Sequence, residues 1–376
     1  MNCISKIIII GTNHHNTLSM VRCFGEEGRK VSLYIYGDEN SYIASSRYIE
    51  EVFYFKTAVD AINSLLLNPD SRIKPLIISC SDEASSIIDQ FYDQLNSKYH
   101  FFNAGEPGRI THFMNKQFQM VLALESGFCV PKTFETFPND IQIDRINYPC
   151  IIKPTSSING GKNIAICYSE DRLGIAIKSF PPQYGVLIQD FINREYEIVI
   201  LGVTYNQDTV IPGYIHKHRD DKGGTTYSTV KSVHSLPSDL IESCLKLIKT
   251  IGYNGLWGIE CIKSDNGYYF IELNLRNDAT TYSMKVAGVN LPYLYYQLVA
   301  NIPIQLNEHQ VREINSIVEF NDFNFVLKRK IGLIKWLRQY QSAECEYFYS
   351  KTDPKPYQER KKQYLRFILL RFLKLK

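Results

Sequence analysis

Residues 255–276 read GLWGIECIKSDNGYYFIELNLR, in which two apolar runs flank a polar stretch at 264–267. Asp, Asn and Gly are favoured in tight turns between antiparallel strands, so this pattern predicts a β-hairpin. Glu260 and Glu272 interrupt the apolar runs and would lie on neighbouring strands, near the end away from the turn. A carboxylate among apolar residues is costly unless something compensates its charge. We therefore expect a charge-compensated acidic site here rather than a surface hairpin whose acidic residues face water.

The polar residues after Glu272 extend this site. Asn274 and Arg276 follow Glu272 at every second position, so the three side chains share one face of a strand. The oxygens of Glu260, Glu272 and Asn274 form a hard ligand set that suits Mg²⁺ holding phosphates, with Mn²⁺ as an alternative. Arg276 is expected to bind a carboxylate or a developing oxyanion.

The spacing Glu–x11–Glu–x–Asn–x–Arg resembles the metal-binding hairpin of the ATP-grasp family. The resemblance of the chain to this family covers roughly residues 110–300. Upstream, strand-like runs at 6–10, 31–36 and 76–79 alternate with helical stretches, which predicts a parallel sheet covered on both faces. Gly11 follows the first run, but no GxGxxG pattern supports a dinucleotide site.

The predicted organisation has three parts. An α/β N-terminal lobe with a parallel sheet precedes an α+β ATP-grasp fold of two sheet-containing lobes, and a basic helical C-terminal extension follows. The expected bounds are 1–110 for the first domain, 111–304 for the second (small lobe about 111–188, large lobe 189–304), and 305–376 for the extension. Further strands are expected at 150–153, 163–168, 186–190, 197–203, 209–212, 256–262 and 268–273, and helices at 112–127, 170–179, 237–251 and 290–301.

The resemblance also implies the phosphate-binding residues. Lys116, at the start of a helix, is similar to the family's first lysine, which contacts the ATP phosphates. Lys153 stands before Pro154 at the end of an apolar run, as does the family's second lysine, which contacts the α-phosphate and the adenine side. The stretch 156–162 resembles the family's mobile glycine-rich loop, whose backbone N–H groups approach phosphate oxygens; its residues Ser156, Gly160 and Gly161 are the implied contacts.

The nucleoside would lie against residues 186–197. The strand containing Gln189, Asp190, Phe191 and Ile192 resembles the one that hydrogen-bonds adenine, although the family often has Glu where Gln189 stands. Glu195 matches the position that binds the ribose hydroxyls; a register shift of two residues would assign that role to Glu197, and a salt bridge with Arg194 or another neighbour is the structural alternative.

Residues 213–231 occupy the place of a substrate-proximal loop in the family. A basic residue there often reaches the γ-phosphate, and we expect Lys217 to do so, with His216 and His218 as competitors. The two histidines alternate with Lys217, which suggests a strand edge, and no third ligand for zinc is apparent.

The composition excludes several other classes of protein. The formal net charge of +3 is too small to indicate a nucleic-acid partner. The nine cysteines include no CxxC pair, which argues against a zinc or disulfide framework and favours a reducing cytoplasm. No window approaches the roughly 18 apolar residues of a membrane span.

The function implied by the resemblance is that of an ATP-dependent carboxylate–amine ligase. The carboxylate substrate would attack ATP to give an acyl phosphate and ADP, and an amine acceptor would then displace phosphate, with Arg276 stabilising the oxyanion. The competing interpretations are a nucleotide-binding regulator without catalysis and a membrane-surface adaptor. A homodimer is a further expectation.

The end of the chain carries a pattern of its own. Leu365, Ile368, Leu369 and Phe372 recur at helical spacing among basic residues, which suits an amphipathic helix. Residues 357–376 would then contact the inner face of the membrane peripherally, or else pack on the body with a solvated basic face. Residues 347–356 resemble the tail of bacterial D-aspartate or cell-surface glycan ligases, which implies a cell-envelope precursor as acceptor.

Overall fold

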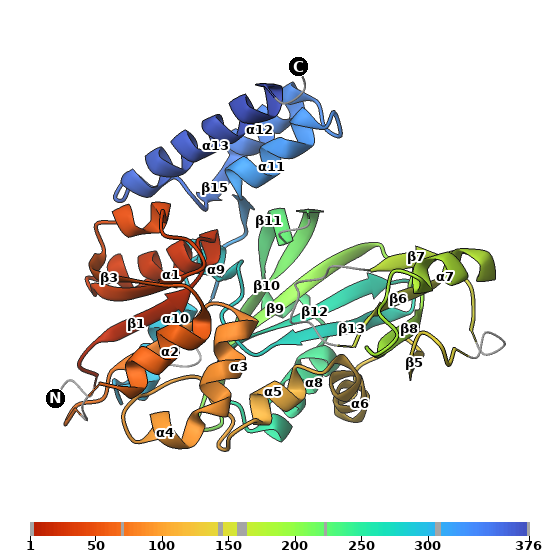
Figure 1. Cartoon of the computed structure of the whole chain (residues 1–376), viewed down its shortest axis with the longest axis horizontal. Coiled ribbons are helices and arrows are strands. Elements are labelled where there is room, and N and C mark those ends of the chain that lie inside the picture. The colour runs from red at the N-terminus through yellow and green to blue at the C-terminus, as the bar shows by residue number, and fades with distance from the viewer. Residues whose placement is uncertain are drawn as a thin grey trace.

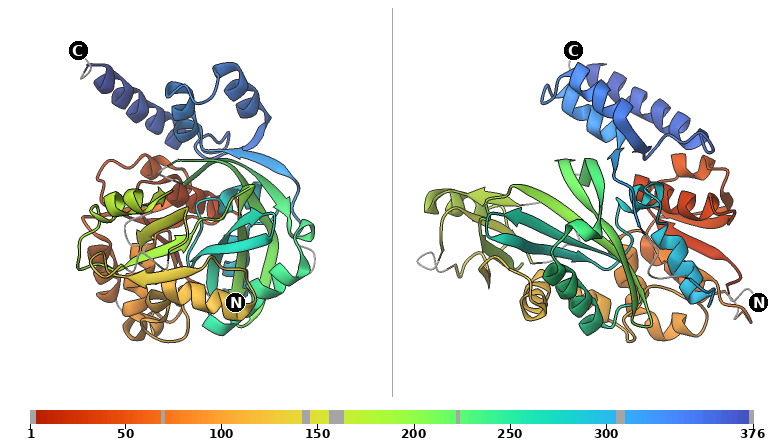
Figure 2. Two further views of the ribbon diagram at one scale, coloured as in Figure 1. Left: turned by 90° about the vertical axis from the view of Figure 1, so that its right-hand side faces the viewer. Right: turned by 180° about the vertical axis from the view of Figure 1, so that it is seen from behind.

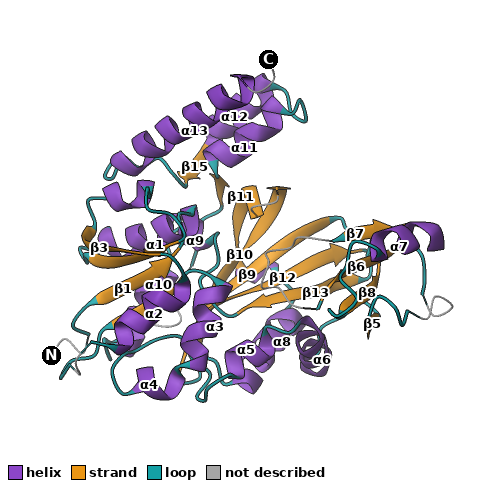
Figure 3. Cartoon of the chain, in the orientation of Figure 1, coloured by secondary structure: helices purple, strands orange, loops and turns teal. Residues whose placement is uncertain are grey.

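The computed structural model describes residues 4–68, 71–141, 146–155, 164–221, 224–304 and 310–373, with side chains up to residue 370. Three sheets follow one another across the molecule (Figures 1 and 3). The N-terminal lobe lies at one side, the largest sheet in the middle and the smallest sheet at the other side. The last helices form a separate layer above the N-terminal lobe and the largest sheet.

The N-terminal lobe contains the parallel sheet that the sequence predicts, in the order β3-β2-β1-β4. On the central strand the isoleucines alternate: Ile7 and Ile9 join one buried cluster, and Ile8 and Ile10 join the other. Both faces of the strand are thus covered, as a parallel sheet requires. The elements are β1 (Ile7–Gly11), α1 (His15–Gly25), β2 (Val31–Tyr36), β3 (Ile49–Phe55), α2 (Ala58–Leu66), β4 (Leu76–Ser79), α3 (Asp82–Gln90) and α4 (Tyr92–Asn96).

The helix expected at 112–127 is two helices, α5 (Arg109–Phe113) and α6 (Lys116–Ser126). Asn115 separates them, because its side chain accepts hydrogen bonds from the N–H groups of Gln117 and Phe118 and so begins a new helix. Gly127 ends α6 in a left-handed conformation, with φ of 105°.

The small sheet has the order β5-β8-β6-β7 and is covered by α7 (Glu170–Ile177). Its strands are β5 (Thr133–Thr136), β6 (Cys150–Pro154), β7 (Ala165–Cys167) and β8 (Val186–Asp190). Three of the four, β6, β7 and β8, were expected within one residue at each end, except that β7 begins two residues later than expected.

The large sheet has seven strands in the order β13-β12-β9-β10-β11-β14-β15. Residues 213–231 were expected as a loop, but residues 213–221 are instead the end of β10 and residues 224–231 belong to the antiparallel strand β11. The elements of this part are β9 (Tyr196–Tyr205), β10 (Asp208–Asp221), β11 (Gly224–Ser232), α8 (Ser238–Ile251), β12 (Gly255–Ser264), β13 (Gly267–Asn274), α9 (Thr281–Val286) and α10 (Leu291–Val299).

The C-terminal segment is more than a helical extension. β14 (Ile314–Ile317) pairs with β11, and β15 (Ala343–Glu346) pairs with β14, so the large sheet continues beyond the expected boundary at residue 304. The helices are α11 (Glu319–Leu327), α12 (Leu333–Ser342) and α13 (Lys355–Leu373). Within the described residues, none of the helices combines the length and apolar character that crossing a bilayer needs.

A buried ion pair fastens the C-terminal segment to the N-terminal lobe. Arg22 of α1 lies 3.2 Å from Asp353, and both side chains are at most 1% exposed. The Arg22 guanidinium also donates to the carbonyls of Tyr347 and Phe348, and Asp353 accepts from Ser46 and from the Arg47 N–H. These hydrogen bonds satisfy two charges that burial alone would make very costly.

Removing Asp353 should therefore be far more damaging than removing an exposed acidic partner. We expect Asp353→Ala to lower the free energy of unfolding in urea by about 3–5 kcal/mol, because it leaves the Arg22 charge buried and unpaired. The control is Glu344→Ala, which removes an exposed pair with Arg312 and should cost at most about 1 kcal/mol. Equal losses in the two variants would contradict this assignment.

Candidate active site

The two acidic residues of the β12–β13 hairpin lie side by side. Glu260 and Glu272 are directly paired across the strands, and Gly258 pairs with Asn274 two positions away. Directly paired residues project to the same face, so both carboxylates and the Asn274 amide point to one side of the sheet. The Asn274 amide donates to Glu260 at 3.4 Å. The hairpin predicted from the sequence thus brings all three candidate metal ligands together.

Lys217 compensates the charge of Glu260. Its ammonium lies 2.7 Å from Glu260 and 3.6 Å from Glu197. Burial alone would lower the pKa of Lys217, but Glu260, Asp220 and Glu197 outweigh it and raise that pKa, so this lysine remains charged. Burial and the neighbouring Glu272 raise the pKa of Glu260, against the opposing effect of Lys217.

The register of β10 excludes the two histidines from this cluster. Lys217 pairs with Glu197 of β9, whereas His216 pairs with Ile198 and so projects to the opposite face. There the His216 ring stacks on Tyr196 at 4.4 Å, and His218 hydrogen-bonds Thr229 at 2.7 Å. Of the three candidates for the γ-phosphate, only Lys217 faces the carboxylates.

Two more buried lysines lie near the second carboxylate of the hairpin, Glu272. Lys116, at the first turn of α6, has its ammonium 3.6 Å from Glu272. Lys153 of β6 is only 5% exposed, and burial together with Lys116 lowers its pKa to about 8, although Glu272 opposes this. Ammonium groups held this close in a buried place favour the binding of an anion. Ser156, Gly160 and Gly161 lie outside the described residues.

The strand expected to hold the adenine ring has one open donor. The N–H groups of Asp190 and Phe191 donate to the carbonyls of Lys132 and Pro149. The Gln189 side chain is buried, and its amide donates to the Thr133 hydroxyl at 2.8 Å. Among the described residues the Ile192 N–H makes no hydrogen bond, which makes it a candidate donor to a ligand.

The two candidates for the ribose lie in different surroundings. Glu195 is half-exposed, follows the segment 189–192 that is expected to bind adenine, and lies 3.7 Å from Lys263. Glu197 belongs to the carboxylate cluster through Lys217 and also pairs with Arg194 at 2.5 Å. The salt bridge with Arg194 weighed for Glu195 is therefore made by Glu197.

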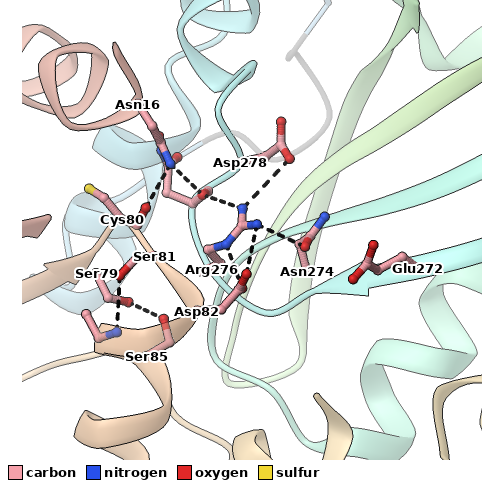
Figure 4. Close-up of polar contacts among 12 residues, drawn as sticks. Asn16, Ser79, Cys80, Ser81, Asp82, Ser85, Glu272, Asn274, Arg276 and Asp278 are labelled. Carbon is pink, nitrogen blue, oxygen red and sulfur yellow. Dashed lines mark hydrogen bonds and ion pairs between the residues drawn. The ribbon is translucent and has the colours of Figure 1, made fainter. Parts of the chain in front are cut away.

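Arg276 bridges the large sheet and the N-terminal lobe. Figure 4 shows its guanidinium between Asp82, Asn274 and Asp278. It contacts Asp82 at the start of α3 through two nitrogens, at 2.7 and 3.3 Å, and donates to the Asn274 oxygen at 3.1 Å. Burial opposes its charge, but Asp82 and Asp278 raise its pKa, so it stays protonated.

Sequence reasoning missed Asp82 and Asp278 as parts of this site. Asp82 lies in the first turn of α3, where an acidic residue suits the helix dipole whether or not it belongs to a site. Its partner Arg276 is 194 positions away, and only the packing of the two lobes brings them together. Asp278 lies 4.0 Å from the same guanidinium and accepts from the Thr280 N–H at 2.8 Å.

A cavity of about 280 Å³ lies where these groups meet. One wall belongs to the N-terminal lobe, where the His14 imidazole accepts from the Asn16 N–H at 3.2 Å. Burial and Arg276 lower the pKa of His14 to about 4, so this ring is neutral at pH 7. The polar lining residues are His14, Asn16, Ser81, Asp82, Lys217, Thr225, Glu260, Arg276, Asp278 and Thr280.

The donor set fits a magnesium ion that also binds phosphate. Among the described residues no three His, Cys, Asp or Glu side chains could hold a metal by themselves. Glu260, Glu272 and Asn274 supply only part of an octahedral shell, which matches the way Mg²⁺ keeps waters and phosphate oxygens as its other ligands. The raised pKa of Glu260 shows that its negative charge needs compensation.

Comparison with known proteins bears on this arrangement. Residues 125–289 match the family model described as the ATP-grasp domain. The sequence is 24% identical over 159 residues to the carbamoyl phosphate synthase large chain of Saccharolobus islandicus, covering 40% of this chain and 15% of the relative. It is 26% identical over 171 residues to a formate-dependent phosphoribosylglycinamide formyltransferase of Prochlorococcus marinus, covering 43% of each. The chain thus matches less than half the length of these relatives.

Solved structures resemble most of the chain. The N5-carboxyaminoimidazole synthetase of Staphylococcus aureus complexed with ADP has a TM-score of 0.67 at 15% identity, over 88% of this chain and 87% of that one. An L-amino acid ligase of Bacillus licheniformis has a TM-score of 0.63 at 14% identity, over 83% and 79%. The chain therefore carries an ATP-grasp domain and has the fold of the ATP-grasp family.

Proposed function

We propose that this protein is an ATP-dependent carboxylate–amine ligase that releases ADP and phosphate. The observation that carries the proposal is the pairing of Glu260 with Glu272, beside Asn274 and within reach of buried lysines on either side. Similar proteins are named as a synthase, a synthetase and a ligase, and one similar structure holds ADP. The presence of all three expected metal ligands, Glu260, Glu272 and Asn274, argues against a regulator without catalysis.

The residues divide the work of binding Mg·ATP. Glu260, Glu272 and Asn274 would hold the metal, which when bound neutralises phosphate charge. Lys116 and Lys153 would contact the phosphates, and the Ile192 N–H would donate to the adenine ring. Lys217, now paired with Glu260, would turn to the γ-phosphate once that carboxylate binds the cation. Glu195, which follows the adenine segment 189–192, would bind the ribose hydroxyls, with Glu197 as the alternative.

The chemistry then needs little acid–base assistance. A carboxylate oxygen of the substrate bonds to the γ-phosphorus while the bond to the ADP oxygen breaks. The amine attacks the resulting acyl phosphate, the carbon–nitrogen bond forms, and phosphate leaves as the amine gives up a proton to solvent. The cavity between the lobes, beside Lys217 and Glu260, is where we place the two substrates. The cell-envelope acceptor expected from residues 347–356 stays a prediction.

Arg276 has less freedom for oxyanion binding than the sequence suggests. A guanidinium carries five N–H groups, and four of them donate to Asp82, Asn274 and the Asn277 carbonyl. One N–H remains on the nitrogen that lies 4.0 Å from Asp278. We therefore propose that Arg276 mainly positions Asn274 and that any contact with an oxyanion uses this one donor.

The first prediction concerns the metal. Glu272→Gln should abolish ATP-dependent ADP release, because it removes one of two charged ligands from the ATP-bound cation. Circular dichroism and thermal unfolding should remain close to those of the unaltered chain. The control is Glu344→Gln, an exposed carboxylate far from the hairpin, which should leave turnover unchanged. Full turnover by Glu272→Gln would rule out the assigned ligand.

The second prediction concerns the pH dependence of ATP binding. Lys153 has a pKa of about 8 in the free protein, and a bound phosphate would raise it. ATP affinity should therefore fall by up to about tenfold per pH unit above pH 8, with proton uptake on binding. Calorimetry in buffers of different ionisation enthalpy measures that uptake. In Lys153→Arg, which stays charged, the pH dependence should disappear; its persistence there would assign it to another group.

The third prediction tests Arg276 as a positioning residue. Arg276→Lys keeps the positive charge, but a lysine lacks the planar guanidinium that donates to Asp82 and Asn274 at the same time. The Mg²⁺ concentration that gives half-maximal ADP release should rise by about 10–100-fold, as for other outer-shell partners of metal ligands. An unchanged Mg²⁺ requirement with a lower maximal rate would instead place Arg276 on the reacting substrate.

A further inference from the structure

The last helix is covered along only part of its length. Tyr357 and Tyr364 pack on Phe320 of α11, with ring centroids 5.5 and 5.1 Å away, and Gln363 donates to the Asn40 carbonyl. Beyond Tyr364 the helix leaves the body, and Figure 2 shows its end projecting outward. α13 is therefore anchored at its start and unsupported near its end.

The unsupported part exposes apolar side chains over a wide arc of its circumference, with the basic Arg366 among them. Leu365, Phe367, Leu369 and Leu370 are 55–60% exposed. At about 100° of rotation per residue these four positions spread over more than half of the helix surface. An apolar helix surface of this breadth is usually covered by protein or by lipid.

A second exposed apolar group lies in the same C-terminal layer. Leu333, Ile334 and Leu337 of α12 are 51%, 69% and 42% exposed. They come two residues after the run Lys328, Arg329 and Lys330 and are interspersed with Lys335 and Arg338. Figures 1 and 2 place α12 and α13 at the same end of the molecule.

The net charge of this C-terminal layer is opposite in sign to that of the rest of the chain. Residues 305–376 hold fifteen Lys and Arg against eight Asp and Glu, a net charge of +7. The other 304 residues carry the remaining twenty-seven basic and thirty-one acidic side chains, a net charge of −4. Several of the acidic side chains are also turned inward: Asp322 pairs with Arg219, Asp353 pairs with Arg22, and Glu319 accepts backbone N–H bonds.

We propose that the exposed end of α13 and the basic α12 region dock on an anionic lipid bilayer. Basic and apolar side chains interleaved on exposed helices match a surface that offers acidic headgroups above acyl chains. A second copy of the chain would bring like charge against like charge, and a nucleic acid would leave the Leu and Phe side chains uncovered. Residues 365–373 span roughly 13 Å at 1.5 Å per residue, far short of the about 30 Å of a bilayer core, so the helix lies in the interface.

The test uses the full chain and two kinds of vesicle. The protein should co-sediment with phosphatidylcholine vesicles that contain phosphatidylserine, and should not do so with phosphatidylcholine alone or at high salt. Replacing Leu365, Phe367, Leu369 and Leu370 with Ser should weaken binding at least tenfold. The matched control replaces exposed Leu67 and Ile175, which are 86% and 63% exposed elsewhere, and should bind normally.

Three outcomes would overturn the proposal. One is equal binding by the fourfold variant and the control. Another is the absence of binding to anionic vesicles. The third is a concentration-dependent dimer, seen by light scattering, that disappears in the fourfold variant, because this would assign α13 to self-association. Thermal unfolding of the fourfold variant, expected to be unchanged, separates loss of docking from loss of fold. The inference does not depend on the proposed ligase activity.

Discussion

The mutual repulsion of Glu260 and Glu272 is the constraint around which the middle of this protein is built. The register of β12 on β13 places the two carboxylates next to each other. Two lysines from other elements offset them: Lys217 comes from β10 across β9, and Lys116 comes from the start of α6. The order of the strands in the large sheet and the position of α6 against it thus both serve to compensate these two buried carboxylates.

The same pairs explain how the site can accept a highly charged ligand without becoming unstable in its absence. Each lysine is now paired with a carboxylate. When Mg·ATP binds as proposed, the carboxylates turn to the cation and the lysines turn to the phosphates. Ion pairs are exchanged rather than created, so no charge is buried alone at any stage. Lys153 is the exception: Glu272, which also contacts Lys116, favours its charge, but burial and Lys116 outweigh this and lower its pKa to about 8.

The parts of this arrangement that could be predicted are those with a local signature. β2, β4 and β8 have the expected bounds, because short apolar runs bounded by turn residues define strands. β14 and β15 were missed, because polar residues interrupt these four-residue strands (INSI and AECE), whereas β4 is an apolar run (LIIS). His216 could not be separated from Lys217, because that choice depends on which face β10 presents. Asp82 could not be linked to Arg276, because their contact exists only after two lobes have packed.

Two arginines link the N-terminal lobe to the rest of the chain, and their surroundings give them different roles. Arg22 and Asp353 are at most 1% exposed, and the carbonyls around Arg22 satisfy its remaining donors. Separating that pair would leave a charge unpaired in the interior, so this contact is permanent. Arg276 and Asp82 are 17% and 30% exposed and border the cavity, so this pair stays partly in contact with solvent. The lobes are therefore joined by one ion pair that is fully enclosed and by a second that a ligand in the cavity would reach. The enclosed pair lies further along α1 than Asn16, which lines the cavity.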